Sequence, residues 1–269
     1  MDQQTLHTSS AFDTIAQSYD KMFEQNTITQ QIRPLITKSL LSHFTAGDHV
    51  LELNCGTGTD AIALAEYGIR ITAIDSSPVM IDRAESKIRQ KRFGEMIETK
   101  VMGFEQLNEL VDVGFDGAFS NFGGFNCIPN VEHVAHDLAA LIKPRGSFIA
   151  CIINKVSLWE ITSFFARGKF SKAFRRLRNN GCLVRVGNSI VQTWYYTPEE
   201  FTAMISPWFS VEKIYGINIF SPLPNSTAFV QRHPRLTSAL LNVDNNIRTL
   251  FPFYGLGDHF VIAARRIDR

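Results

Sequence analysis

Residues 49–60 read HVLELNCGTGTD, and this stretch decides the fold of the chain. It begins with a short, largely apolar run, which is typical of a strand buried on both faces of a parallel sheet. Gly56 and Gly58 follow, and glycines let a backbone turn tightly and approach a ligand closely. Helical periodicity resumes at once with Ala61 and Leu64. The stretch therefore predicts a strand, a ligand-binding turn and a helix in succession.

The same alternation continues on the carboxyl side of this stretch. Short apolar runs predict strands at 70–75, 98–103, 115–121 and 146–154, and amphipathic runs predict helices at 77–91 and 131–142. Strands that alternate with helices favour a parallel sheet with crossover helices. We therefore expect an α/β fold in which residues 48–154 form the ligand-binding core.

The remaining residues depart from this rhythm. Residues 10–44 carry apolar side chains at spacings of three and four, which predict two helices before the core. Residues 155–196 read as a helical piece followed by a hairpin around Gly187, and we expect them to form a cap inserted into the core. Residues 155–196 and residues 221–257 both lack the low complexity of a linker. The sequence therefore predicts one domain over residues 1–269, in which residues 197–269 complete the sheet and include a second insertion at 221–257.

Composition argues against several classes of function. Lys and Arg number 27 and Asp and Glu 26, so the formal net charge is +1, which disfavours binding of nucleic acid. The four cysteines form no Cys-x-x-Cys pair, so no metal site is indicated. The first residues lack the pattern of an export signal, and no apolar run approaches the roughly 20 residues of a membrane span. We expect a cytoplasmic protein without stable membrane insertion.

An acidic residue follows the glycine turn at an informative distance. Asp75 ends the next predicted strand, at about the offset of 20 residues from which a carboxylate reaches ribose hydroxyls in a nucleotide-binding unit. The spacing Gly56-x-Gly58-x-x-Ala61 also satisfies the dinucleotide fingerprint, in which a pyrophosphate lies over the helix N-terminus. Spacing alone therefore leaves a nicotinamide or flavin cofactor open.

Several motifs together resemble one known family. LELNCGTGT, IDSSPVM, FDGAFSN and LIKPRGSF look like the successive motifs of class I S-adenosylmethionine-dependent methyltransferases. The segment FDTIAQSYD, residues 12–20, is similar to the N-terminal helix of ubiquinone and menaquinone C-methyltransferases, which closes over the cofactor. Residues 10–44 are then a lid. The resemblance implies a Rossmann-like sheet of seven mostly parallel strands with an antiparallel last strand, to which the cap is added.

The resemblance also implies which residues bind the cofactor, S-adenosylmethionine. Gly56, Thr57 and Gly58 are expected to line the loop under its methionine part. Glu52 is expected to orient that loop. Asp75 is expected to bind both ribose hydroxyls.

Further contacts follow from the same resemblance. Ser76 and Met80 are expected to flank the adenine, and Tyr19 to contact the cofactor from the lid. Many family members have Gly where this chain has Asn54, and Asn is among the few residues that tolerate a left-handed backbone. Many also have an acid after the third strand that binds the adenine amine. Here either Glu105 or a backbone carbonyl has to serve instead.

Ligands of parallel sheets lie beyond the carboxyl ends of the strands, which points to Ser120 and Asn121 after the fourth strand. An antiparallel last strand starts at that same edge, so Tyr254 and His259 are candidates to face the substrate. His259 is the first candidate for a general base and His133 the second. The alternatives are a structural role for His259 and a solvated or capping role for His133.

The cap contains a basic and aromatic stretch whose meaning the sequence leaves open. Its cations are Arg167, Lys169, Lys172, Arg175, Arg176 and Arg178. A solvated helix face is the plainest interpretation, and an acidic substrate, a carrier protein or a membrane surface are the alternatives.

The sequence thus predicts transfer of a methyl group from S-adenosylmethionine to O, N or C of a small molecule, without a metal. Two other functions stay open at this point. An NAD(P)-dependent oxidoreductase would use the same glycine loop, and a non-catalytic S-adenosylmethionine-binding protein would keep only the cofactor pocket.

Overall fold

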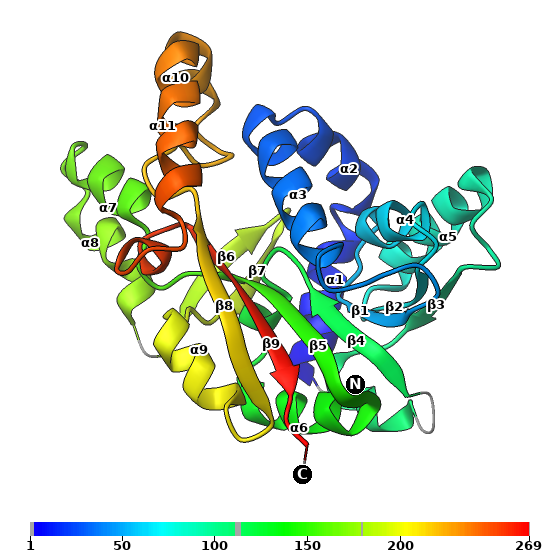
Figure 1. Ribbon diagram of the computed structural model, residues 1–269. Helices are drawn as coiled ribbons and strands as arrows, with labels where there is room; N and C mark the ends of the chain where they lie inside the picture. The colour runs from blue at the N-terminus through cyan, green and yellow to red at the C-terminus, as the bar shows by residue number, and fades with distance from the viewer. Residues whose placement is uncertain (1–2, 111–113, 179, 269) are drawn as a thin grey trace.

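A computed structural model describes residues 3–110, 114–178 and 180–268. Seven strands form one sheet in the order β3-β2-β1-β4-β5-β9-β8 (Figure 1). They are β1 (His49–Leu53), β2 (Arg70–Asp75), β3 (Ile97–Val101), β4 (Phe115–Ser120), β5 (Ile142–Ile153), β8 (Phe209–Ile217) and β9 (His259–Arg266). The first five run parallel, and β9 pairs antiparallel with both β5 and β8. The predicted Rossmann-like sheet with an antiparallel last strand is confirmed.

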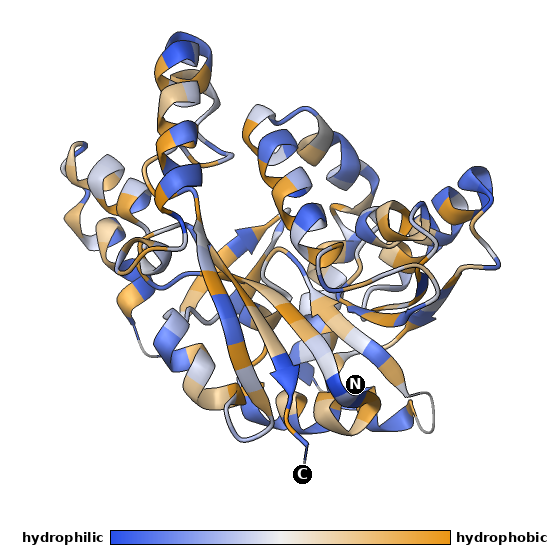
Figure 2. Ribbon diagram, in the orientation of Figure 1, coloured by the Kyte–Doolittle hydropathy of each residue, from blue (hydrophilic) through white to orange (hydrophobic). Residues whose placement is uncertain are grey.

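Helices cover both faces of this sheet, because its central strands are apolar on both sides. Val50 of β1 packs in one core with α4 (Thr59–Ala65) and α5 (Pro78–Lys91). Its neighbour Leu51 points to the opposite face and packs in a second core with α6 (Val131–Leu141) and α9 (Pro198–Ile205). The edge strand β8 instead mixes hydrophilic and hydrophobic residues along its length (Figure 2). The glycine turn between β1 and α4 is thus held on a rigid three-layer frame.

The N-terminal segment forms three helices where two were expected. These are α1 (Gln3–Asp13), α2 (Ala16–Glu24) and α3 (Thr27–Leu40). Between α1 and α2 the Thr14 hydroxyl donates to the carbonyl of Ala11, a local bond that competes with helix continuation. Asn26 caps α3 by accepting the backbone N–H of Ile28 at 3.0 Å. The periodicity was right for helix but did not reveal this break.

The insertions lie on the carboxyl side of the sheet (Figure 1). The cap comprises α7 (Leu158–Phe165), α8 (Phe170–Ala173), the short 3-10 helix η3 (Arg175–Leu177) and the hairpin β6 (Cys182–Val186)–β7 (Ser189–Thr193). Val186 pairs with Ser189 across the predicted turn. The second insertion contains α10 (Thr227–Arg232), α11 (Pro234–Ile247) and η4 (Phe253–Gly255), and the first two project from the body. Within the described part of the chain, no helix combines the length and apolar character needed to cross a membrane.

Candidate functional site

A cavity lies where β1, β2 and β4 end, under the N-terminal helices. It collects residues that are far apart in the sequence, from Thr5 on α1 to Ile128 beyond β4. Nine of the residues expected to contact the cofactor line it: Tyr19, Glu52, Asn54, Gly56, Thr57, Asp75, Ser76, Met80 and Asn121. Three do not: Gly58, Glu105 and Ser120.

The glycine turn has the left-handed backbone that its sequence implies. Gly56 and Gly58 have φ of 54° and 71°, and Asn54, which stands where relatives often have Gly, has φ of 48°. The Asn54 side chain also joins the turn to β4, because its amide donates to the carbonyl of Asn121 at 2.9 Å and it accepts the Ser120 hydroxyl. Ser120 therefore supports the cavity from behind instead of lining it.

Gly58 serves packing between helices instead of ligand contact. A Cβ atom built on it lies only 3.0 Å from the Cβ of Ala84 on α5. Helix α4 can therefore start close against α5 only if residue 58 lacks a side chain.

Asp75 ends β2 and holds the turn through its carboxylate. One oxygen accepts the backbone N–H of Gly56 at 2.8 Å and the other accepts that of Ser77 at 2.9 Å. Burial raises the pKa of Asp75 to about 6, although these two hydrogen bonds oppose the rise. The carboxylate can thus fix the loop and still receive further donors such as ribose hydroxyls.

Glu52 and Asn121 each present a buried oxygen without a partner among the described residues. Burial raises the pKa of Glu52 well above its usual range, and its Oε2 accepts no hydrogen bond. Oδ1 of Asn121 also accepts no hydrogen bond from a described residue, while Nδ2 of the same side chain donates to Asp60 at 2.9 Å. Buried acceptors are normally satisfied, so two of them beside a cavity fit a ligand that brings N–H or O–H donors.

An ion pair on the lid side of the cavity was not foreseen. Arg33 of α3 pairs with Asp60, the residue that follows the glycine turn. The Arg33 guanidinium also lies 4.9 Å from the centre of the Phe122 ring. Phe122 lines the cavity with φ of 52°, a strained backbone for a bulky residue, and such strain clusters at functional sites.

A second polar cluster fastens the lid to the glycine turn. The Lys87 ammonium of α5 donates to Asp20 of α2 at 3.0 Å and to the hydroxyls of Thr57 and Thr59 at 3.2 and 2.9 Å. Tyr19 precedes Asp20 on α2, and a carbon of its ring lies 3.7 Å from the position that a Cβ atom would take if Gly56 had a side chain. Asp20 ended a recognisable motif, but nothing in the sequence around Lys87 marked its partner.

Met102, Gly103 and Phe104 line the cavity beyond β3, on the side where the adenine is expected. Glu105 lies behind them on the 3-10 helix η1 (Phe104–Glu109), where it accepts the Thr5 hydroxyl at 3.2 Å. Because Gly103 and Phe104 line the cavity and Glu105 does not, we propose the backbone for the contact to the adenine amine.

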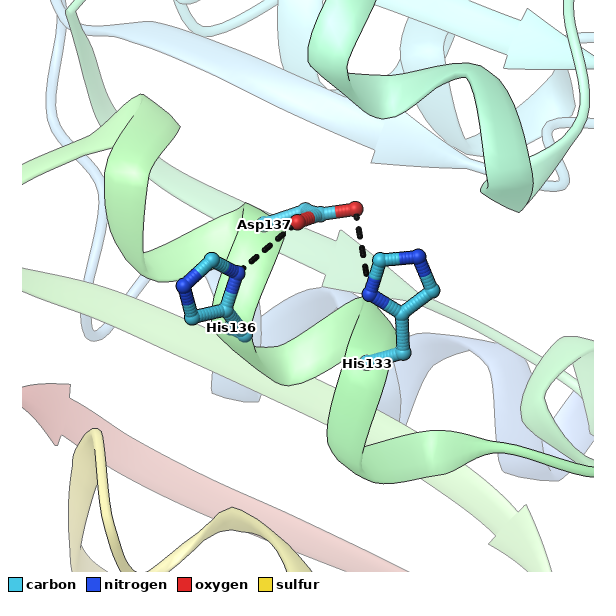
Figure 3. A group of neighbouring side chains, drawn as sticks. All are labelled: His133, His136 and Asp137. Atoms are coloured by element: carbon cyan, nitrogen blue, oxygen red, sulfur yellow. Dashed lines mark hydrogen bonds and ion pairs between the residues drawn. The ribbon is translucent and has the colours of Figure 1, made fainter.

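The three candidates for catalysis do not line the cavity. His259 lies at the start of β9 with its Nδ1 3.0 Å from Asp258, and Tyr254 lies in η4. The sheet order puts β5 between β4, whose end borders the cavity, and β9, where His259 lies. His133 is exposed on α6 beside His136 and Asp137 (Figure 3). We expected these residues at the carboxyl edge of the sheet, but the sequence did not reveal that β5 separates β9 from β4.

One arginine of the cap is buried, which corrects the expectation of a fully solvated basic face. Arg176 donates to Glu160 at 2.6 Å, to Asp258 at 2.7 Å and to the carbonyl of Asn154 at 3.0 Å. Burial alone would raise the pKa of Asp258, but the charges of Arg176 and His259 hold it well below its usual range. The cap is thus anchored to the ends of β5 and β9.

Comparison with known proteins agrees with this geometry. A family model described as a methyltransferase domain matches residues 50–146. The demethylmenaquinone methyltransferase of Tropheryma whipplei is 25% identical over 213 residues, covering 78% of this chain and 80% of the relative. The ubiquinone biosynthesis O-methyltransferase of Coxiella burnetii is 30% identical over 131 residues, which cover 46% of this chain and 52% of the relative.

Solved structures show the same fold over nearly the whole chain. The [4+2]-cyclase SpnF superposes with a TM-score of 0.65 at 13% identity, covering 99% of this chain and 98% of the other. These comparisons give no support to a nicotinamide-dependent oxidoreductase. Because the methyltransferase match covers the strands and the turn that line the cavity, residues 50–146 form a methyltransferase domain, and the cofactor of this enzyme is S-adenosylmethionine.

Proposed function

We propose that the protein methylates a small-molecule acceptor, which enters the cofactor cavity on the side of Arg33, Asn121 and Phe122. The observation that carries this proposal is that one cavity joins the cofactor residues of β1 and β2 to the loop after β4 and to the lid. The ring of Phe122 stacks edge-on against Phe23, with centroids 5.9 Å apart. An aromatic wall and a guanidinium there suit a planar or anionic acceptor.

In this proposal, bound S-adenosylmethionine supplies an electrophilic methyl group, and the residues of the chain fix its place. Asp75 holds the ribose hydroxyls through its ionised carboxylate. Glu52 and Asn121 offer their free oxygens to the ammonium of the methionine part. Displacement at the methyl carbon needs sulfur, carbon and nucleophile in line, so rigid positioning of both ligands supplies the main acceleration.

The side chains around the cavity limit the kind of acceptor. Among the described residues that line it there is neither His nor Lys. Asp60 is paired with Arg33 and bonded to Asn121, and the free oxygen of Glu52 is assigned here to the ammonium of the methionine part. We infer that the nucleophile arrives without needing a strong base, as a neutral amine, a thiolate or an acidic hydroxyl. The quinone methyltransferases among the relatives make phenols and quinols part of this set.

The test starts with calorimetric titration of the purified chain with S-adenosylhomocysteine and, separately, with NADH. Asp75→Ala is expected to abolish measurable S-adenosylhomocysteine binding, whereas Asp82→Ala, at an exposed position of α5, leaves it unchanged. Absence of binding in the unmutated chain contradicts the cofactor assignment.

The second stage measures transfer of labelled methyl groups to panels of amines, thiols, phenols and quinols. Transfer itself has to be measured, because one fold hosts several reactions. Phe122→Leu is expected to lower kcat/KM for any active acceptor about 10-fold or more while cofactor affinity stays within about two-fold. Equal loss of cofactor affinity would place Phe122 at the cofactor and not at the acceptor.

A further inference from the structure

The cap carries several cations that form no ion pair with any residue that the structure describes. From residue 161 to residue 198 the sequence contains no Asp or Glu. Arg175 and Arg176 pair with Glu160. The remaining cations between α7 and the hairpin are exposed and form no ion pair with any described residue: Arg167, Lys169, Lys172 and Arg178.

Large apolar side chains are exposed among these cations. Phe165 and Phe170 are 55% and 53% exposed, and their rings contact each other with centroids 4.8 Å apart. Phe174 and Leu177 follow, at 47% and 44%. Grouped aromatic side chains in water usually mark a surface that binds something. We refer to residues 165–178 as the basic–aromatic loop.

The loop is held in this position from its inner side. Arg176, which belongs to the loop, is only 7% exposed and bonds to Asp258 and Glu160. Its guanidinium also lies 5.2 Å from the centre of the Tyr195 ring. This arginine therefore anchors the loop to the residue that precedes β9, and the exposed phenylalanines take no part in its buried ion pairs.

We propose that the basic–aromatic loop docks the protein peripherally on an anionic lipid bilayer. Phenylalanines are apolar enough to enter the boundary between headgroups and acyl chains, and lysines and arginines beside them meet lipid phosphates. Free cations interleaved with aromatic rings complement such a surface in charge and in hydrophobicity. The whole chain has a net charge of only +1, so this attraction is local to the loop.

The first experiment is co-sedimentation of the full chain with vesicles of phosphatidylcholine, with and without phosphatidylglycerol. Binding is expected only to the anionic vesicles and is expected to weaken as salt is raised. The combined variant Arg167→Gln, Lys169→Gln, Lys172→Gln should weaken it about 100-fold, since each cation near the surface contributes roughly a five-fold factor.

The matched control removes three cations elsewhere, with Arg89→Gln, Lys91→Gln and Arg92→Gln, all exposed at the end of α5. This variant should bind vesicles like the unmutated chain. Equal loss in both variants, equal binding to neutral vesicles, or no vesicle binding at all would overturn the proposal. S-adenosylhomocysteine affinity, measured in parallel, verifies that each variant is folded.

A second measurement tests insertion of the aromatic side chains. Phe170→Trp provides a fluorescent reporter in the loop, and Tyr67→Trp provides one at a distant site of similar exposure, 58%. Lipids brominated in their acyl chains should quench the added fluorescence of the first variant and not that of the second. Quenching of neither, or of both equally, contradicts insertion by the loop.

Discussion

Lys87 and Asp20 form an ion pair that joins the lid helix α2 to helix α5, with Nζ 3.0 Å from the carboxylate. The same ammonium bonds to Thr57 and Thr59 of the glycine turn. Lys87→Met is therefore expected to loosen the lid and raise the Kd for S-adenosylhomocysteine about 10-fold, the order that one lost charged hydrogen bond supplies. Calorimetric titration of each variant measures this Kd. Lys91→Met, exposed on the same helix, is the control, and an equal effect in both variants would exclude a lid contact.

Gly58→Ala is expected to destabilise the protein more than Gly47→Ala. Both glycines have left-handed backbones, with φ of 71° and 92°, so each alanine costs about 1–2 kcal/mol in backbone strain. Only at residue 58 does the new methyl group also press on Ala84, since nothing lies within 4 Å of a Cβ at residue 47. Urea unfolding of both variants measures the difference. Equal losses would mean that α4 and α5 can separate at little cost.

Binding of S-adenosylhomocysteine should weaken in acid because of Asp75. Ribose hydroxyls donate to the ionised carboxylate, and the pKa of Asp75 in the free protein is about 6. Affinity should therefore be constant above that pH and fall by up to about ten-fold per unit below it. Calorimetry between pH 5 and 8 would show this. Asp75→Asn, which cannot ionise, should bind weakly with little pH dependence, and a slope retained in that variant would assign the proton elsewhere.

The same raised pKa has the opposite effect on folding. Asp75 in the unfolded chain has its ordinary pKa of 3.8, so the folded state holds the proton more tightly between that value and about 6. Its contribution to stability is fully present below 3.8 and is lost as pH rises through about 6. Unfolding of Asp75→Asn compared with the unmutated chain over this range isolates the contribution.

Arg176→Met should cost roughly 3–5 kcal/mol of stability, because it removes the buried cation that the carboxylates of Glu160 and Asp258 share. Arg175→Met is the neighbouring control, since Arg175 is half-buried and pairs with Glu160 alone. The stability lost in Arg175→Met should be about 1 kcal/mol or less. Thermal and urea unfolding compare them. Equal losses would show that the anchor is not Arg176 in particular.

The difference between the unmutated chain and Arg176→Met should also depend on pH. The pKa of Asp258 is depressed in the folded protein, so its stabilising contribution is present above the ordinary value of 3.8 and is lost as pH falls below it. The two unfolding free energies should therefore converge in acid. A constant difference would assign the stabilisation to packing of the Arg176 side chain.

The sequence predicted the elements that are local in the chain. The strand, turn and helix of residues 49–65, the carboxylate of Asp75 at the end of β2 and the left-handed Asn54 all follow from the identity and spacing of neighbouring residues. The parallel sheet of β1 to β5 could also be predicted, because an alternation of strands and helices permits few topologies. Roles of the cofactor residues in binding remain predictions that titration has to test.

What could not be predicted depends on lateral distances and on partners far apart in sequence. His259 was expected near the substrate because β9 starts at the carboxyl edge of the sheet, but β5 lies between β4 and β9, and His259 does not line the cavity. Lys87 lies 67 residues from Asp20, and no local pattern connects them. Arg176 resembled its exposed neighbours in sequence, and only the fold buries it.

The interior place of β9 bears on how the chain assembles. β9 follows both of its neighbours in sequence, and it lies between β5 and β8. Until it inserts, those two strands each present an unpaired edge, the kind of surface on which chains aggregate. The parallel strands β1 to β5 need no later segment to pair with one another. The cofactor half of the sheet can therefore form early during synthesis, and closure of the other half is the step most open to misassembly.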